Sequence, residues 1–144
     1  MLQFNLPYPP SVNHYYVRTK LGMAIGAPGK AYRQLIWAAL HRCIGGGEKW
    51  DRKPLEDDLM VEIIIYPPDK RKRDMDNIKK ALFDALQFAG LFKDDYQICD
   101  DHTVRINKVV KNGLIDFRIQ AALTREWAAT YAKVTADFLK DFTL

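Results

Sequence analysis

The spacing of apolar residues along this chain predicts a mixture of strands and helices. Apolar and β-branched residues predict strands over Leu2–Leu6 and Leu59–Tyr66, and prolines that cannot continue a β-ladder follow each of them. Apolar residues recur at helical spacing over residues 30–44 and 76–89, which predicts two amphipathic helices. Glycine follows both segments, as is typical of helix C-termini.

The second half of the chain carries the pattern of a β-hairpin. Asn112-Gly113 lies between two apolar segments, residues 103–110 and Leu114–Ala121, and favours a type I′ turn because both turn positions need positive φ. In the register that this turn predicts, Val110 faces Ile115, Lys108 faces Phe117 and Ile106 faces Ile119.

Several segments lack such periodicity or stand apart from the predicted sheet. Residues 11–16 are interpreted as a polar, aromatic loop, and residues 18–29 as a surface loop. The glycines at 45–47 are interpreted as a helix end and linker, because no strand precedes them as a phosphate-binding loop would require. After Thr124, apolar residues at helical spacing predict a C-terminal helical extension over residues 124–144.

Composition limits the class of protein. With 144 residues, of which 48% are hydrophobic and 28% charged, the chain fits a single globular domain spanning residues 1–144. We therefore predict an α+β fold, a small, mainly antiparallel or mixed sheet with helices packed on it. No apolar run approaches the length of a membrane span and the N-terminus lacks a signal-peptide pattern, so we expect a cytoplasmic protein with no membrane partner. The spacing of the two cysteines and three histidines suggests neither a disulfide nor a zinc site.

Charge is informative through its clustering, because the net charge of +4 is modest. Four consecutive cations, residues 70–73, run directly into Asp74 and Asp76, and a second acidic pair, Asp94-Asp95, follows the predicted helix. Cations can hold a polyanion while carboxylates hold Mg²⁺ or Mn²⁺. This combination indicates a metal-dependent enzyme that acts on nucleic acid. Lys80 lies one helical turn after Asp76 and shares its face.

Each of these features also has a simpler interpretation. An Asp-x-Asp pair at the start of a helix is usually an N-cap with a favourable dipole interaction, and a charge run is usually a solvated face. The acidic pair at 94–95 can be an ordinary loop. Metal binding further requires that the chain after the helix fold back to bring Asp95 to Asp74 and Asp76.

The sequence resembles the RusA family of Holliday junction resolvases. The resemblance is most specific between residues 67 and 97, in the runs Arg-Lys-Arg-Asp-Met-Asp-Asn-Ile-Lys-Lys-Ala at 71–81 and Asp-Asp-Tyr-Gln at 94–97. Residues 7–16 and 29–33 are also similar to the family. The resemblance extends to about residue 121, so the predicted helix after it is an extension of the family core.

This resemblance implies a small homodimeric endonuclease, often encoded by phages and prophages, that acts in DNA recombination and repair. Such an enzyme binds four-way junction DNA by shape and nicks two strands symmetrically in a reaction that depends on Mg²⁺, with Mn²⁺ as a substitute. By correspondence of position, the metal ligands are Asp74, Asp76 and Asp95, and the essential lysine is Lys80. The residues that would hold DNA are Arg71, Lys72, Arg73, Asn13, Tyr15 and Tyr16. The roles of Asp84 and Asp94 are left open.

Two other functions remain to be weighed. The first is a non-catalytic nucleic-acid-binding module of phage origin, which would explain the cations and aromatic residues but leaves the aspartates without a role. The second is a transferase in which Asp-x-Asp holds a nucleotide diphosphate, although no nucleotide-binding strand–turn–helix motif accompanies the pair.

Overall fold

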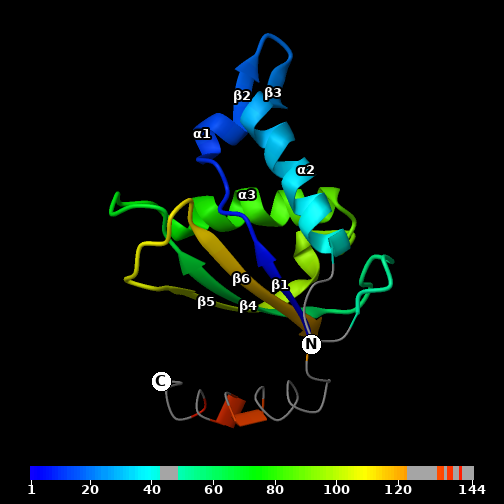
Figure 1. The fold of residues 1–144 in the computed structure, drawn as a ribbon. Helices are drawn as coiled ribbons and strands as arrows, with labels where there is room; N and C mark the ends of the chain where they lie inside the picture. Colours follow the sequence, from blue (N-terminus) through cyan, green and yellow to red (C-terminus); the bar gives the residue numbers. More distant parts are fainter. Residues whose placement is uncertain (43–48, 123–132, 135, 138–139, 141–144) are drawn as a thin grey trace.

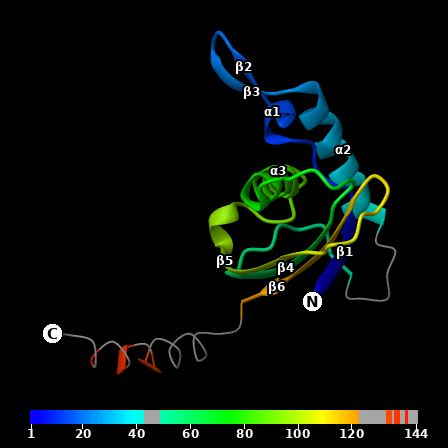
Figure 2. The same ribbon diagram turned by 90° about the vertical axis from the view of Figure 1, so that its left-hand side faces the viewer.

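The computed structural model describes residues 1–42 and 49–122 and, from the C-terminal segment, only 133, 134, 136, 137 and 140. A sheet carries one long helix on its face, and a smaller lobe stands away from it (Figures 1 and 2). The elements are β1 (Leu2–Leu6), α1 (Val12–Tyr15), β2 (Tyr16–Thr19), β3 (Gly22–Ile25), α2 (Ala27–Arg42), β4 (Leu59–Tyr66), α3 (Met75–Phe88), the 3-10 helix η1 (Asp95–Gln97), β5 (Ile98–Arg105) and β6 (Leu114–Ala121).

The main sheet is mixed, which confirms the predicted α+β class. Its strand order is β1-β6-β4-β5, in which β6 runs antiparallel to both of its neighbours and β4 runs parallel to β5. A parallel pair cannot be joined by a tight turn, and here α3 lies in the connection between the two strands. Because the strands before and after α3 are paired with each other, the sheet fixes the positions of the chain at both ends of this helix.

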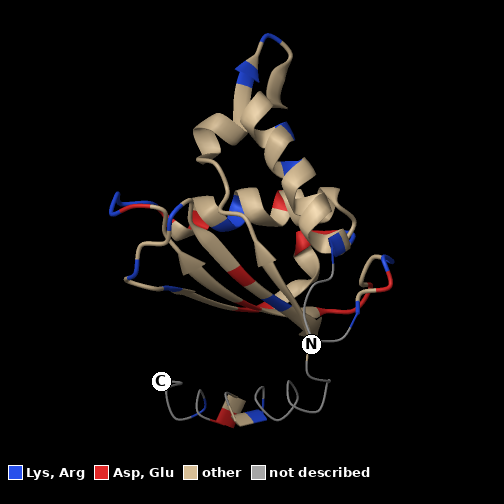
Figure 3. Cartoon of the chain, in the orientation of Figure 1, with Lys and Arg blue, Asp and Glu red and all other residues tan. Residues whose placement is uncertain are grey.

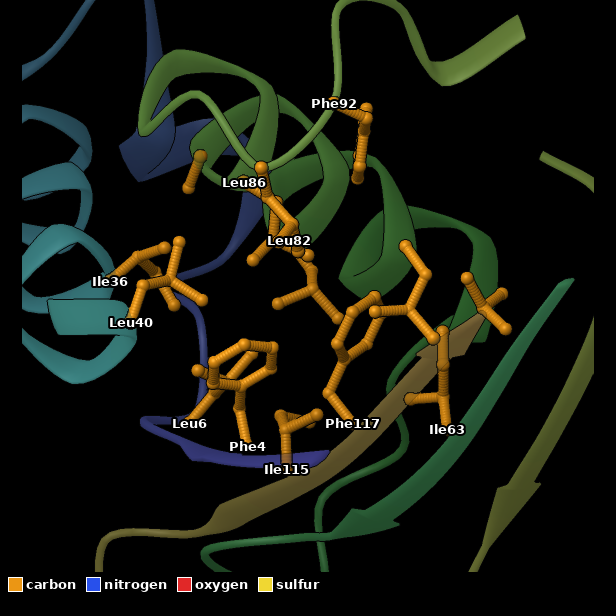
Figure 4. Close-up of a cluster of buried hydrophobic side chains, with 14 of the residues drawn as sticks. Phe4, Leu6, Ile36, Leu40, Ile63, Leu82, Leu86, Phe92, Ile115 and Phe117 are labelled. Carbon is orange, nitrogen blue, oxygen red and sulfur yellow. The ribbon is translucent and has the colours of Figure 1, made fainter. Parts of the chain in front are cut away.

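One hydrophobic core lies between the sheet and the helices. The strands β1, β4 and β6 bury alternate side chains, while α3 turns a stripe that includes Leu82 and Leu86 toward them. Figure 4 shows these side chains meeting Ile36 from α2 and Phe92 from the turn after α3. Phe92 is only 1% exposed, so this turn is fixed by packing.

The predicted hairpin between residues 103–110 and β6 is wrong. The strand is β5, which pairs in parallel with β4, and Phe117 of β6 lies opposite Phe4 and Ile63 instead of Lys108. Asn112 and Gly113 do have positive φ, 66° and 69°, but the turn is closed by the Gly113 N–H on the Val110 carbonyl. The burial patterns explain the pairing, because β6 buries every second residue and suits the middle of the sheet. β5 is largely polar and exposed, and suits an edge.

The predicted loops near the N-terminus are also wrong. Residues 12–15 form the single-turn helix α1. Residues 16–25, which include much of the loop predicted over 18–29, form the hairpin β2–β3, whose strands are joined by the two residues Lys20 and Leu21. α2 begins at Ala27, three residues before the predicted start. A Cβ atom on Gly29 would lie 2.5 Å from the Tyr15 carbonyl oxygen, so only glycine lets α2 pack this closely against α1.

Two predicted features concern residues that the structure does not describe. The glycine linker at 45–47 and most of the C-terminal helix predicted over 124–144 lie outside the described residues. Within the described ranges, no helix combines the length and the hydropathy needed to cross a bilayer.

Candidate active site

The cationic run, residues 70–73, follows β4 and two prolines, and only some of its charged groups are exposed to solvent. Asp69 accepts hydrogen bonds from both terminal nitrogens of Arg73, at 2.6 and 2.8 Å, and from the Arg71 backbone N–H. These bonds, first of all those from Arg73, hold the pKa of Asp69 well below its usual range. The Arg73 guanidinium also lies 5.7 Å from the centre of the Tyr8 ring. Arg73 therefore braces the loop, whereas Arg71 and Lys72 point their charges to solvent.

The Asp-x-Asp pair begins α3. Asp74 is the N-cap, and its Oδ1 accepts a hydrogen bond of 2.9 Å from the Asp76 backbone N–H. The Asp76 side chain is 88% exposed and lies 3.6 Å from the Lys79 ammonium. The N-cap interpretation of Asp74 is thus confirmed, and it leaves the Asp76 carboxylate open to solvent.

Lys79 joins the start of α3 to the edge strand. Its ammonium group lies 3.0 Å from a carboxylate oxygen of Asp101 on β5 and 3.6 Å from one of Asp76. The hydrogen bond to Asp101 is the main cause of the raised Lys79 pKa. Asp101 did not emerge from sequence reasoning, because its place depends on the parallel pairing of β5 with β4.

Lys80 lies under the N-terminal lobe. Its ammonium group is 5.2 Å from the centre of the Tyr16 ring, and the Tyr16 ring lies 4.7 Å from that of Tyr15. Burial, followed by the charge of Asp84, raises the pKa of Tyr16. The structure thus brings two predicted site residues, Lys80 and Tyr16, together from α3 and β2.

Asp84 lies one turn beyond Lys80 and connects three helices. It accepts a hydrogen bond from the Tyr15 hydroxyl and two from Arg33, at 2.7 and 3.2 Å. The Tyr15 side chain is fully buried, and burial is the first cause of its strongly raised pKa. Asp84 and Tyr15 therefore hold α1 and α2 against α3. Of the N-terminal candidates for DNA contact, Asn13 and Tyr16 remain accessible.

Asp95 begins the short helix η1 after α3. Asp94 caps this helix by accepting a hydrogen bond from the Tyr96 N–H, and the Gln97 side chain ties the turn to the backbone of Leu55 and Asp57. Partial burial, then a hydrogen bond with Asp94, raises the pKa of Asp95, to which the charge of Asp84 also contributes. The cap from Asp94 and the hydrogen bonds of Gln97 thus fix the turn that carries Asp95.

The three aspartates predicted to share a metal ion are not gathered into one group. Among the described residues, no three His, Cys, Asp or Glu side chains lie close enough together to hold a metal. Asp74 and Asp76 stand at the start of α3, whereas Asp95 begins η1, after the C-terminal end of that helix. Mg²⁺ nevertheless needs only one or two carboxylates when phosphate and water supply its other ligands, so the Asp74–Asp76 pair fits a metal that arrives with a substrate.

A pocket of about 230 Å³ opens beside Asp74. It lies between the segment 8–13 and the first turn of α3, and its lining brings together Asn13, Lys72, Arg73 and Asp74, all of which are predicted site residues. The pocket, the exposed cations that precede α3 and the open carboxylate of Asp76 all lie at or next to the start of this helix. Such a region can bind a phosphodiester together with a divalent cation.

Comparison with known proteins agrees with this chemistry. The family model described as Endodeoxyribonuclease RusA matches residues 7–115. The crossover junction endodeoxyribonuclease RusA of Shigella sonnei is 36% identical over 117 residues, which cover 79% of this chain and 89% of that protein. The Escherichia coli K12 protein of the same name is 35% identical with the same coverage, and that of Enterobacteria phage HK97 is 37% identical over 74% of this chain and 84% of its own.

Proposed function

Because the chain belongs to the RusA family of endodeoxyribonucleases, we propose that it resolves crossover (Holliday) junctions by nicking two strands symmetrically with the help of a divalent metal ion. The observation that best supports this function is the arrangement on α3, where an exposed Asp76 carboxylate, a capping Asp74 and Lys80 follow exposed cations. This is an enzyme of DNA recombination and repair, and we place it in the cytoplasm with the DNA.

Each residue of this region has a separate task in the proposed reaction. Arg71 and Lys72 hold the DNA backbone, while Arg73 keeps the loop in place through Asp69. Asp74 and Asp76 would hold Mg²⁺ or Mn²⁺ together with the scissile phosphate. Asp95, which follows α3, would have to move toward them to serve as a third ligand. When bound, the metal supplies a water of lowered pKa and neutralises charge on the phosphate. Lys80 stabilises the negative charge that develops on the phosphate during attack.

Two symmetric cuts are made most simply by two equivalent active sites. A symmetric homodimer presents equivalent sites to the two related phosphodiesters of a junction without further components, so we propose a homodimer as the active form. Sedimentation of the protein with and without junction DNA measures this state. A monomer that makes paired cuts would contradict the proposal.

One assay tests the function directly. The protein is incubated with a synthetic four-way junction, a linear duplex and single strands, each with Mg²⁺, Mn²⁺ or EDTA. Paired nicks that appear on the junction only with metal are the expected result. The second candidate function is a non-catalytic nucleic-acid-binding module, which the lack of a preformed three-carboxylate group among the described residues favours. Junction binding without cuts under all conditions would support it.

A further inference from the structure

Positive charge is concentrated in the lobe formed by α1, β2, β3 and α2. No Asp or Glu precedes Glu48 in the sequence, whereas the lobe contains Arg18, Lys20, Lys30, Arg33 and Arg42. Figure 3 shows Lys and Arg on the hairpin and α2, with the acidic residues on α3, the sheet and its loops. The net charge of the chain is +4, so the residues outside the lobe are together slightly negative. The cations of the lobe therefore account for the net positive charge of the protein.

The hairpin β2–β3 projects from this lobe and has an apolar tip. Leu21 is fully exposed and Met23 is 66% exposed. The tip is nonetheless well defined, because the Thr19 hydroxyl donates to the Gly22 carbonyl at 2.8 Å and accepts from the Leu21 N–H at 3.2 Å. Nothing in the described part of the chain covers Leu21, so an ordered turn presents a large apolar side chain to solvent.

The hairpin also continues the surface of the candidate active site. Arg18 pairs with Met23 across the hairpin, two positions along from Tyr16 and Ile25, so these residues share one face. Tyr16 at the base of this face contacts Lys80. The turn residue Lys20 follows Tyr16 by four residues. Four residues span about 13 Å along a strand. This distance corresponds to about four nucleotide steps of DNA.

We propose that the hairpin β2–β3 is a DNA-binding arm that contacts the branch point of the junction. Arg18 and Lys20 bind phosphates, and Leu21 and Met23 pack against bases that are unstacked there. This inference rests on the proposed function for the identity of the substrate. Apolar side chains enter DNA where stacking is already disrupted, and a branch point offers such bases while a linear duplex does not. A second copy of the lobe is a poor partner, because it would bring like charges together.

The apolar contact is tested by binding in EDTA, where metal-dependent nicking does not occur. The double variant Leu21→Ser/Met23→Ser is compared with wild type by fluorescence anisotropy on a four-way junction and a linear duplex. We expect the junction Kd to rise roughly tenfold and the duplex Kd to stay within about twofold. Wild type should also raise the fluorescence of 2-aminopurine placed at the branch point, and the variant should not. Equal effects on both DNAs, or no effect on either, would overturn the inference.

The charged contact is tested by salt dependence. Arg18→Gln/Lys20→Gln should make the negative slope of log affinity against log salt shallower by about 1.8, since each lost phosphate contact removes about 0.9. The matched control Lys49→Gln/Lys53→Gln removes two exposed cations from the loop before β4 and should leave the slope unchanged. Equal slopes for wild type and the arm variant would contradict the proposed phosphate contacts.

Failure of the arm and failure of the proposed function give different results. If wild type nicks junctions and the arm variants bind and nick as wild type does, the arm inference alone is wrong. If wild type nicks nothing with either metal but the arm variants lose junction binding, the arm inference stands and the nuclease function fails. If Leu21→Ser/Met23→Ser dissociates an oligomer in the absence of DNA, the arm is a subunit contact and the inference is overturned.

Discussion

The ammonium group of Lys80 lies 5.2 Å from the centre of the Tyr16 ring, which places the proposed catalytic lysine of α3 beneath the base of the projecting hairpin. A cation held over an aromatic face keeps its charge but loses freedom of position. Tyr16→Leu should lower the rate of junction nicking roughly fivefold, the scale of a partly exposed cation–π contact. Tyr16→Phe keeps the ring and should stay within about twofold of wild type. Single-turnover rates at saturating protein measure the effect, and equal rates for Leu and Phe variants would rule it out.

Substitutions of Asp74 separate its capping role from its proposed metal role. Asparagine caps helices about as well as aspartate, so Asp74→Asn should unfold at nearly the wild-type temperature but lose nicking. Asp74→Ala should lose nicking and about 1 kcal/mol of stability as well, because the hydrogen bond to the Asp76 N–H disappears. Junction binding in EDTA should survive in the asparagine variant. Residual metal-dependent nicking by Asp74→Asn would show that this carboxylate is not a ligand.

The Arg33–Asp84 pair should matter for stability. Its two side chains are 18% and 32% exposed. Arg33→Met therefore leaves a partly buried carboxylate whose one remaining hydrogen-bond partner among the described residues is the Tyr15 hydroxyl. We expect the free energy of unfolding to fall by about 2 kcal/mol. Arg71→Met is the matched control, because Arg71 is 84% exposed and should change stability by less than about 0.5 kcal/mol. Chemical denaturation measures both, and equal stabilities would contradict the structural role of the pair.

The cations of the 70–73 run should not be equivalent. Arg71→Ser/Lys72→Ser should make the slope of log junction affinity against log salt shallower by about 1.8. The thermal unfolding midpoint should stay unchanged. Arg73→Ser should instead lower that midpoint, since it removes the bidentate bond to Asp69. If all three substitutions affect only salt dependence, the bracing role of Arg73 is wrong.

Low pH should weaken the interaction of Asp69 with Arg73 in the loop between β4 and α3. Because the folded-state pKa of Asp69 is lowered, chiefly by the hydrogen bonds from Arg73, this carboxylate stabilises the protein above its unfolded pKa of about 3.9. That contribution declines as pH falls below this value toward the folded pKa. The unfolding midpoint of Asp69→Asn should therefore lie below that of wild type at pH 6, and the gap should narrow toward pH 3. Calorimetry across this range tests the direction, and a constant gap would contradict it.

Local patterns predicted the elements whose apolar faces are strong. β1, β4, α2 and α3 could be read from periodicity, and the cap at Asp74 from residue type and position. Non-local pairing could not be predicted in this way. The turn residues Asn112 and Gly113 marked a turn but could not specify that β6 lies between β1 and β4. That pairing leaves β5 at the edge, where Asp101 meets Lys79.

The same limit applies to the N-terminal lobe. Tyr15 and Tyr16 are adjacent in sequence and equally suited to contact DNA, yet one is fully buried against Asp84 and the other lies beside Lys80. Which of two neighbouring tyrosines is accessible depends on how α1 packs on α3, and periodicity over four residues carries no such information. The hairpin β2–β3 was missed because its strands are short and mostly exposed.

The close packing of Gly29 has a consequence for the direction of the proposed DNA-binding arm. A methyl group at this position would lie 2.5 Å from the Tyr15 carbonyl oxygen, so α2 would have to tilt away from α1. β2 follows α1 without a break, and the direction of the hairpin would change with it. A relative with a side chain at this position would present its arm at another inclination to α3, and would suit branches that diverge at a different angle.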